Sequence, residues 1–146
     1  MISSSTPKYK LGNEPWLFYK ENIDHFYTSY SDDDIRLICD NIKKLSELVK
    51  REYNLDFVFI PLPEKYTLYH KIVNNDKESD FLEKVYRGLA ERNVLYIDLL
   101  DTLKTTHGYV YPRTDTHLNE NGSEIAFEKL LNVIQQDTTF NYLFNN

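Results

Sequence analysis

The sequence predicts a three-layer α/β domain with a mainly parallel sheet. Short continuous apolar runs, typical of strands that are covered on both faces, alternate along the chain with segments of helical periodicity. With 146 residues, 41% of them hydrophobic and 27% charged, the chain has the size and apolar content for one hydrophobic core. We expect this domain over residues 12–137, after a flexible segment over residues 1–11 and before a C-terminal tail over residues 138–146.

The first two predicted elements are a short strand and a long helix. Residues 16–19 form an apolar run after a glycine and a proline, which predicts the strand. Ser31 is a candidate N-cap, with Asp34 three residues later in a capping-box position, and the helix is expected to run to about Tyr53. Its inward face is predicted from apolar residues at three- and four-residue spacing: Ile35, Ile38, Ile42, Leu45 and Val49.

A second strand and a second helix are predicted next. Residues 56–60 are read as a continuous apolar run that Pro61 and Pro63 end, as in a strand of a parallel sheet. A loop is expected over residues 64–76. Residues 79–92 read as a helix that Ser79 caps, with Leu82, Val85 and Leu89 facing inward.

The last predicted elements are a strand, a long loop and a helix. Residues 94–97 form another buried-type strand, and Asp98 falls at its C-terminal end. A loop is expected over residues 102–119, and a helix begins near Asn121. In proteins with an open parallel sheet, ligands bind beyond the C-terminal ends of the strands. The loops at 61–69 and 102–119 both follow strands, so we expect them to share one edge.

Composition excludes several classes of protein. The net charge is −6 and the basic residues are dispersed, which argues against nucleic acid as the main partner. No run approaches the ~20 apolar residues that cross a bilayer. The single cysteine, Cys39, excludes an internal disulfide and cysteine-rich metal sites, and its helical setting predicts a small core residue. No glycine-rich phosphate loop is present, so no nucleotide cofactor is expected.

The N-terminus gives a separate indication about location. Residues 1–8 contain no apolar stretch of the kind that a secretory signal carries. The sequence alone therefore predicts either an intracellular protein or a piece of a longer one.

The sharpest chemical feature is the pair Asp115 and His117. Residues two apart in an extended segment point to the same side, so the carboxylate can accept a hydrogen bond from one imidazole nitrogen. The other nitrogen is then free to take a proton from a hydroxyl group. The alternative is a loop histidine that simply bonds a turn aspartate. Together with His107 these residues could form a metal trio, but the spacing matches no strong metal motif, and no metal is expected.

Other candidate residues lie in the same two loops. Lys65 follows a strand and could contact a substrate hydroxyl or carboxylate, or it could be an ordinary solvated lysine. Tyr69, His70 and Tyr111 could form a wall on which a sugar stacks, although loop aromatics commonly cover the edge of a core instead. Arg113 could pair with an acidic polymer or with Asp115, and Asn119 is a further candidate substrate contact.

Four motifs, in order, resemble the SGNH hydrolase-like domain of the alginate O-acetyltransferase family. Thr114, Asp115, His117 and Gly122 match its Thr-Asp-x-His…Gly segment, with Leu118 where the family has tryptophan. The further motifs are the opening Trp16-Leu17-Phe18, the post-strand Pro61…Lys65…Tyr69 stretch, and the strand that ends in Asp98-Leu99. The similarity covers roughly residues 12–135 and implies an SGNH or flavodoxin-like arrangement of layers.

The resemblance implies transfer or removal of acetyl groups on the hydroxyls of exopolysaccharides, in the periplasm or outside the cell. The family uses a Ser-His-Asp triad, so His117 would be the general base and Asp115 would orient it. The family's serine lies downstream in a Gly-Asp-Ser sequence, which does not occur in these 146 residues. We therefore expect that the serine and at least one strand come from a missing C-terminal segment or a second chain.

Two alternatives remain open at this stage. One is a non-catalytic module that keeps the cleft and binds polysaccharide or another partner. The other is an intracellular α/β protein in which the Asp-x-His pattern arose by chance.

Overall fold

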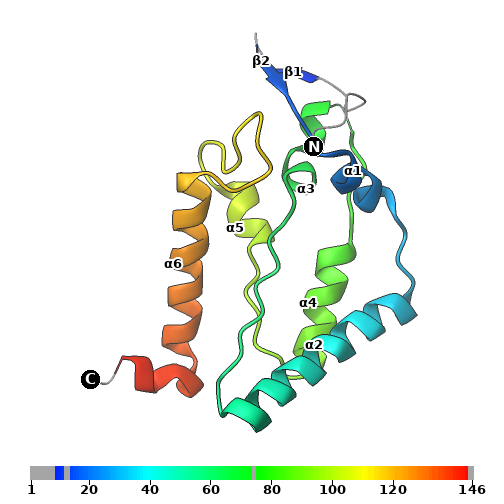
Figure 1. The fold of residues 1–146 in the computed structure, drawn as a ribbon. Coiled ribbons are helices and arrows are strands. Elements are labelled where there is room, and N and C mark those ends of the chain that lie inside the picture. The colour runs from blue at the N-terminus through cyan, green and yellow to red at the C-terminus, as the bar shows by residue number, and fades with distance from the viewer. Residues whose placement is uncertain (1–8, 12–13, 74, 145–146) are drawn as a thin grey trace. The chain divides into compact units, whose positions relative to one another are not determined.

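The computed structural model describes residues 9–11, 14–73 and 75–144 (Figure 1). The described chain forms two compact units. Unit 1 takes its residues from 1–29, 62–79 and 100–125, and unit 2 from 30–61, 80–99 and 126–146. The elements are β1 (Tyr9–Leu11), β2 (Glu14–Trp16), α1 (Lys20–Tyr27), α2 (Asp32–Tyr53), α3 (Lys65–Tyr69), η1 (His70–Val73), α4 (Phe81–Glu91), α5 (Leu100–Thr105), α6 (Glu120–Gln136) and η2 (Thr138–Leu143).

The long helix α2 of unit 2 has the predicted start and end, but Leu45, which was expected on its inward face, is 47% exposed. Ser31 is its N-cap, and the Asp34 backbone N–H donates to Ser31 Oγ at 3.2 Å. The Ser31 backbone N–H donates in return to Asp34 Oδ2 at 2.9 Å, which completes the predicted capping box. The helix ends at Asn54, which adopts the left-handed conformation with φ 52°.

Replacing Ser31 with Ala is expected to destabilise unit 2 by about 1 kcal/mol, because the Asp34 backbone N–H at the start of α2 loses its acceptor, Ser31 Oγ, which also donates to Asp34 Oδ2. Urea denaturation followed by circular dichroism measures this change. The exposed Ser29, which lies just outside the helix, provides the matched control, and Ser29→Ala should leave the midpoint unchanged. Equal midpoints for both variants would show that the box contributes nothing to stability.

Helices α2 and α4 pack together around the core of unit 2. Its buried members are Ile35, Cys39, Val85, Leu89 and Val94. Gly88 permits the close approach, since a Cβ at this position would lie 2.6 Å from Cys39 Sγ. Cys39 is fully buried, as its helical setting predicted. The Ser79 cap was wrong, because the N-cap of α4 is Asp80, one residue later, and the helix begins at Phe81.

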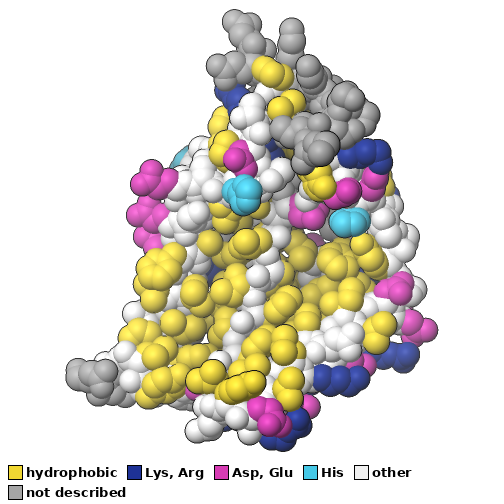
Figure 2. All heavy atoms as spheres, in the orientation of Figure 1, with side chains coloured by type: hydrophobic (Ala, Val, Ile, Leu, Met, Phe, Trp, Pro, Cys, Tyr) yellow, Lys and Arg dark blue, Asp and Glu magenta, His cyan; other side chains and the backbone are white. Residues whose placement is uncertain are grey.

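The two apolar runs of unit 2 lie next to each other in parallel. The Phe59 N–H donates to Leu95 O and the Ile97 N–H donates to Phe59 O, both at 2.9 Å. These bonds form one parallel bridge, between Phe59 and Tyr96. Residues 56–59 are only half-buried, and Figure 2 shows hydrophobic side chains gathered on the visible face of this unit. Pro61 ends the first run and cannot donate, so pairing does not extend in that direction. A mainly parallel sheet thus remains a prediction.

Unit 1 has an aromatic core in place of the expected first strand. Trp16, Phe18, Phe26 and Tyr66 are its buried members. The predicted strand over residues 16–19 was wrong beyond Trp16, because β2 ends there after pairing antiparallel with β1. Residues 17–19 then carry Phe18 into the core, and α1, which the sequence analysis did not anticipate, follows directly.

Helical turns occupy parts of both predicted loops. The loop expected over residues 64–76 contains α3 and η1, and the loop expected from residue 102 begins only after α5. The reason for α3 is packing: the Tyr66 ring contacts Phe18 and Phe26 edge-on, with centroids 5.3 and 5.1 Å apart. Such tertiary contacts outweigh the weak helix propensity of a segment rich in tyrosine and threonine. The predicted tail contains η2, which Asp137 caps through the Thr139 N–H at 2.8 Å.

Among the residues that the structure describes, no helix is both long and apolar enough to cross a bilayer. The loop between α5 and α6, drawn in yellow in Figure 1, carries the Asp-x-His segment in unit 1.

Candidate active site

Asp115 and His117 form a hydrogen-bonded pair in the loop before α6. His117 Nδ1 lies 2.7 Å from Asp115 Oδ1, and the His117 backbone N–H donates to the same oxygen at 2.8 Å. These bonds hold the pKa of the Asp115 carboxyl below its usual range. The side chain of His117 is 88% exposed. The pair predicted from the sequence is therefore formed, and it faces solvent.

The bond to Asp115 selects the tautomer of His117. An ionised carboxylate can only accept, so Nδ1 must be the nitrogen that carries the proton. Nε2 of the neutral ring is then an unprotonated base, directed away from Asp115. This is the arrangement that general-base activation of a hydroxyl requires.

Lys65 lies beneath this loop and is almost fully buried, with a relative exposure of 4%. Its Nζ donates to Leu17 O and Arg113 O, both at 2.8 Å, and to Asp115 O at 3.2 Å. The ammonium also lies 5.1 Å from the centre of the Trp16 ring. Since the three N–H groups of the ammonium all have backbone partners, Lys65 holds the loop in this structure. It is not the solvated lysine that was one of the two predictions from the sequence.

Burial lowers the pKa of Lys65 to about 8, against an ordinary value of 10.5. The folded state thus loses this proton about two and a half units earlier than the unfolded state. Burial of the charged ammonium lowers the free energy of unfolding. This cost is present in full below pH 8, decreases as the pH rises from 8 to 10.5, and is absent above pH 10.5, where Lys65 is neutral in both states.

Raising the pH from 7.5 to 9.5 is therefore expected to increase the free energy of unfolding through Lys65 by about 2 kcal/mol. Denaturation curves of the wild type and Lys65→Met at both pH values isolate this contribution, because the variant retains every other titrating group. A pH response that is the same in both proteins would contradict the assignment.

The two tyrosines proposed as a sugar-stacking wall have structural partners. The Tyr111 O–H donates to Pro63 O at 2.7 Å, and its ring is buried. Tyr69 Oη accepts the Val110 N–H at 2.9 Å, and its ring packs edge-on against Trp16 at 5.0 Å. Burial raises the pKa of Tyr111 to about 12. Both phenols therefore fix the loop to the α3 region, and of the two only Tyr111 lines the cavity described below.

Asn119 and Arg113 also make hydrogen bonds that hold the loop in place. The Asn119 side chain accepts the Gly122 N–H at 2.8 Å and donates to Tyr109 O at 2.7 Å, which caps the start of α6. The Arg113 carbonyl accepts the Leu17 N–H at 2.8 Å, while its guanidinium lies 6.0 Å from the Tyr109 ring centre. Tyr109 lies in the loop itself and is 41% exposed.

A cavity of about 200 Å³ lies beside the pair in unit 1. Thr116, the residue between Asp115 and His117, contributes to its wall. Two of its lining residues, Lys65 and Tyr111, were predicted from the sequence, whereas Glu64, which carries the one carboxylate of the lining, was not. Its position next to Lys65 after a predicted strand was the available signal. The lining residues are Tyr19, Asn22, Leu62, Glu64, Lys65, Tyr66, Tyr111 and Thr116.

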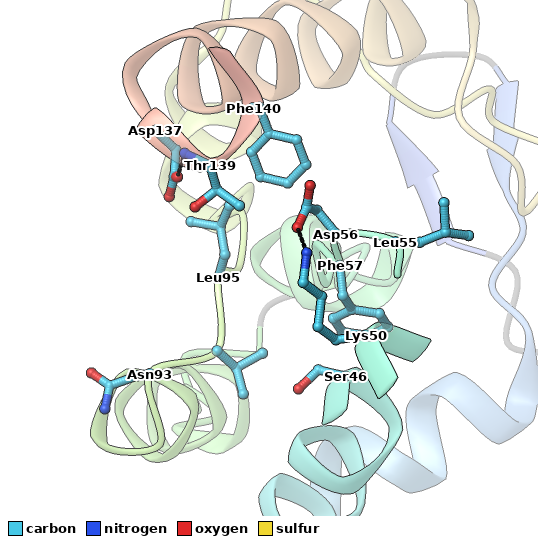
Figure 3. Close-up of a pocket in the computed structure, with 11 residues that line it drawn as sticks. Ser46, Lys50, Leu55, Asp56, Phe57, Asn93, Leu95, Asp137, Thr139 and Phe140 are labelled. Atoms are coloured by element: carbon cyan, nitrogen blue, oxygen red, sulfur yellow. Dashed lines mark hydrogen bonds and ion pairs between the residues drawn. The ribbon is translucent and has the colours of Figure 1, made fainter. Parts of the chain in front are cut away.

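A larger cavity of about 420 Å³ lies in unit 2 (Figure 3). Its charged groups are already partnered, since Lys50 pairs with Asp56 at 3.0 Å and Asp137 caps η2. It contains no histidine. In the part of the chain that the structure describes, no three His, Cys, Asp or Glu side chains come close enough to hold a metal ion. The smaller cavity next to Asp115 and His117 is therefore the better candidate site.

Comparison with known proteins identifies the family and the fold of this chain. The chain is 24% identical over 142 residues to a probable alginate O-acetylase, AlgJ, of Pseudomonas syringae pv. tomato, covering 93% of this chain and 36% of that protein. The solved O-acetyltransferase domain of Pseudomonas putida AlgJ has the same fold, with a TM-score of 0.72 at 21% identity, and covers 96% of this chain and 50% of that one. This chain thus spans about a third of the curated relative. Residues 10–145 match the family described as the SGNH hydrolase-like domain of the acetyltransferase AlgX, and the chain belongs to that family.

Proposed function

We propose that this chain provides the Asp-His part of a Ser-His-Asp site that transfers acetyl groups to or from polysaccharide hydroxyls. The observation that supports it most is the Asp115–His117 bond of 2.7 Å, with Nε2 of an exposed imidazole left as a base. Membership of an acetyltransferase family and the alginate O-acetylase relative favour an acetyl group and a polysaccharide such as alginate. By the same likeness, the proposed location is the cell envelope or periplasm.

The nucleophile in this proposal is a serine from polypeptide outside residues 1–146, either a further segment or a second chain. No Gly-Asp-Ser sequence occurs within these residues. The chain spans half of the solved AlgJ domain, so a comparable length of polypeptide has no counterpart here. The same polypeptide would add strands beside residues 57–60 and 94–97, which would complete a mainly parallel sheet.

The proposed reaction proceeds in two steps. His117 Nε2 takes the proton of the serine hydroxyl while Oγ attacks the carbonyl carbon of an acetyl ester, and His117 then protonates the leaving alkoxide. In the second step a polysaccharide hydroxyl, or water, gives its proton to His117 and attacks the seryl acetyl ester. The proton returns to serine Oγ, which leaves an acetylated polymer or free acetate. Asp115 holds the imidazolium that forms in both steps.

The test is acetyl-ester turnover by the protein carrying a tag on residues 1–146 and purified from its own cells, so that any associated or contiguous serine-bearing segment is retained. Release of 4-nitrophenol from 4-nitrophenyl acetate, and acetate transfer to alginate, are measured for the wild type and His117→Ala. His107→Ala is the matched control, since His107 is exposed in the same loop. We expect turnover that is lost only in His117→Ala.

A folded protein without turnover that still binds alginate would favour the alternative, a polysaccharide-binding module with an inactive site. Turnover that survives in His117→Ala would exclude the proposed role of this imidazole.

A further inference from the structure

Three segments that are far apart in the sequence meet at one buried ammonium group. Lys65 begins α3, Leu17 follows β2, and Arg113 and Asp115 lie in the Asp-x-His loop. The three carbonyls that Lys65 Nζ contacts are separated from it by 48, 48 and 50 residues. These are the same segments that carry three of the motifs found in the sequence.

The surroundings of the ammonium leave it few other partners. The Trp16 and Phe18 rings lie 5.1 and 5.4 Å from Nζ and exclude water on one side. The segment around Leu17 and the Asp-x-His loop are also bonded to each other directly, since the Leu17 N–H donates to Arg113 O at 2.8 Å. A single cation thus fixes the backbone on which Asp115 stands to the aromatic core of unit 1.

We propose that Lys65 is the positioning residue of the Asp115–His117 pair: its ammonium, through bonds to the Leu17, Arg113 and Asp115 carbonyls, fixes the backbone turn in which Asp115 orients His117. The turn needs this support because both side chains are largely exposed and the pair rests on bonds to one carboxylate oxygen. A lysine suits the role, since three donors on one atom match three acceptors, and its positive charge also favours the ionised form of Asp115. The inference rests on the proposed function for its catalytic meaning.

The first test is a pH titration of the wild type by carbonyl ¹³C NMR, which needs no catalytic activity. Because burial lowers the pKa of Lys65 to about 8, the ammonium loses a proton between pH 7 and 9 and keeps two donors for three carbonyls. The carbonyl shifts of Leu17, Arg113 and Asp115 should then move together with a common midpoint near 8. The other titratable groups that line the cavity contact none of these three carbonyls jointly, so they would not move all three shifts in concert; they are Tyr19, Glu64, Tyr66 and Tyr111.

The second test compares Lys65→Met with Leu103→Ala. Methionine keeps the apolar stem without donors, while loss of the buried Leu103 destabilises the same unit without touching the three carbonyls. We expect the pKa of the Asp115 carboxyl to rise toward its ordinary value in Lys65→Met and to stay low in Leu103→Ala, each measured below its melting temperature. Independent carbonyl titrations in the wild type, or an unchanged Asp115 pKa in a folded Lys65→Met, would overturn the inference, even if the acetyl-transfer assay succeeds.

Discussion

Substituting Asp115 with Asn is expected to lower the rate of the proposed acetyl transfer by about 10⁴-fold. The reason is the tautomer of His117. The Asp115 carboxylate accepts from Nδ1 at 2.7 Å and so leaves Nε2 unprotonated. An asparagine amide can donate to Nδ1 instead, which would move the ring proton to Nε2 and leave no base for the serine hydroxyl.

Turnover of 4-nitrophenyl acetate by protein purified from its own cells measures this effect. Asp101→Asn is the matched control, because Asp101 is an exposed carboxylate in the same unit and should keep the wild-type rate. The effect should fall on kcat, since the proton transfer belongs to the transition state. A loss of less than tenfold in Asp115→Asn would contradict the role of Asp115 in orienting His117.

The second large effect is expected for Gly122→Ala, which should destabilise unit 1 by about 3 kcal/mol. A Cβ at Gly122 would lie 2.6 Å from Val110 O and 2.9 Å from Val110 Cβ. The nearest atom belongs to the backbone and cannot move aside as the end of a side chain could. The same Val110 carbonyl accepts the Asn119 N–H at 2.9 Å, so relief of the clash would disturb the start of α6 and the loop beside it.

Gly108→Ala provides the comparison. No atom lies within 4 Å of a Cβ at Gly108, but its φ of +84° disfavours any side chain, so a loss of about 1 kcal/mol is expected. Urea denaturation of both variants separates close packing from backbone strain. If Gly108→Ala were the more destabilised of the two, packing against Val110 would not explain the glycine at position 122.

The features that were predicted correctly are those that depend on interactions between residues close together in the sequence. The Ser31 capping box and α2 were predicted because the cap and the apolar spacing both lie within one continuous segment. The Asp115–His117 pair was predicted for the same reason, since the two residues are neighbours in the chain and their bond needs no distant support to be recognised.

Features that depend on distant contacts were not predictable. Helix α3 forms because Tyr66 packs on Phe18 and Phe26, and no pattern within residues 65–69 indicates those partners. The role of Lys65 was missed for a related reason: its acceptors are backbone carbonyls, which leave no signal in residue types. The apolar run at residues 56–60 predicted a strand covered on both faces. In the structure residues 56–59 are half-buried and Ile60 is exposed, and the run pairs with residues 94–97 through one isolated parallel bridge between Phe59 and Tyr96.

The most direct test of the proposed triad is labelling with a fluorophosphonate, which reacts with an activated serine. The tagged protein is purified from its own cells, labelled, and analysed by peptide mass spectrometry for the wild type, His117→Ala and the control His107→Ala. The account predicts one labelled serine outside residues 1–146, in the same polypeptide or in a co-purified one, and loss of that label only in His117→Ala. No labelled serine in a folded wild-type preparation, or a label that persists in His117→Ala, would contradict it.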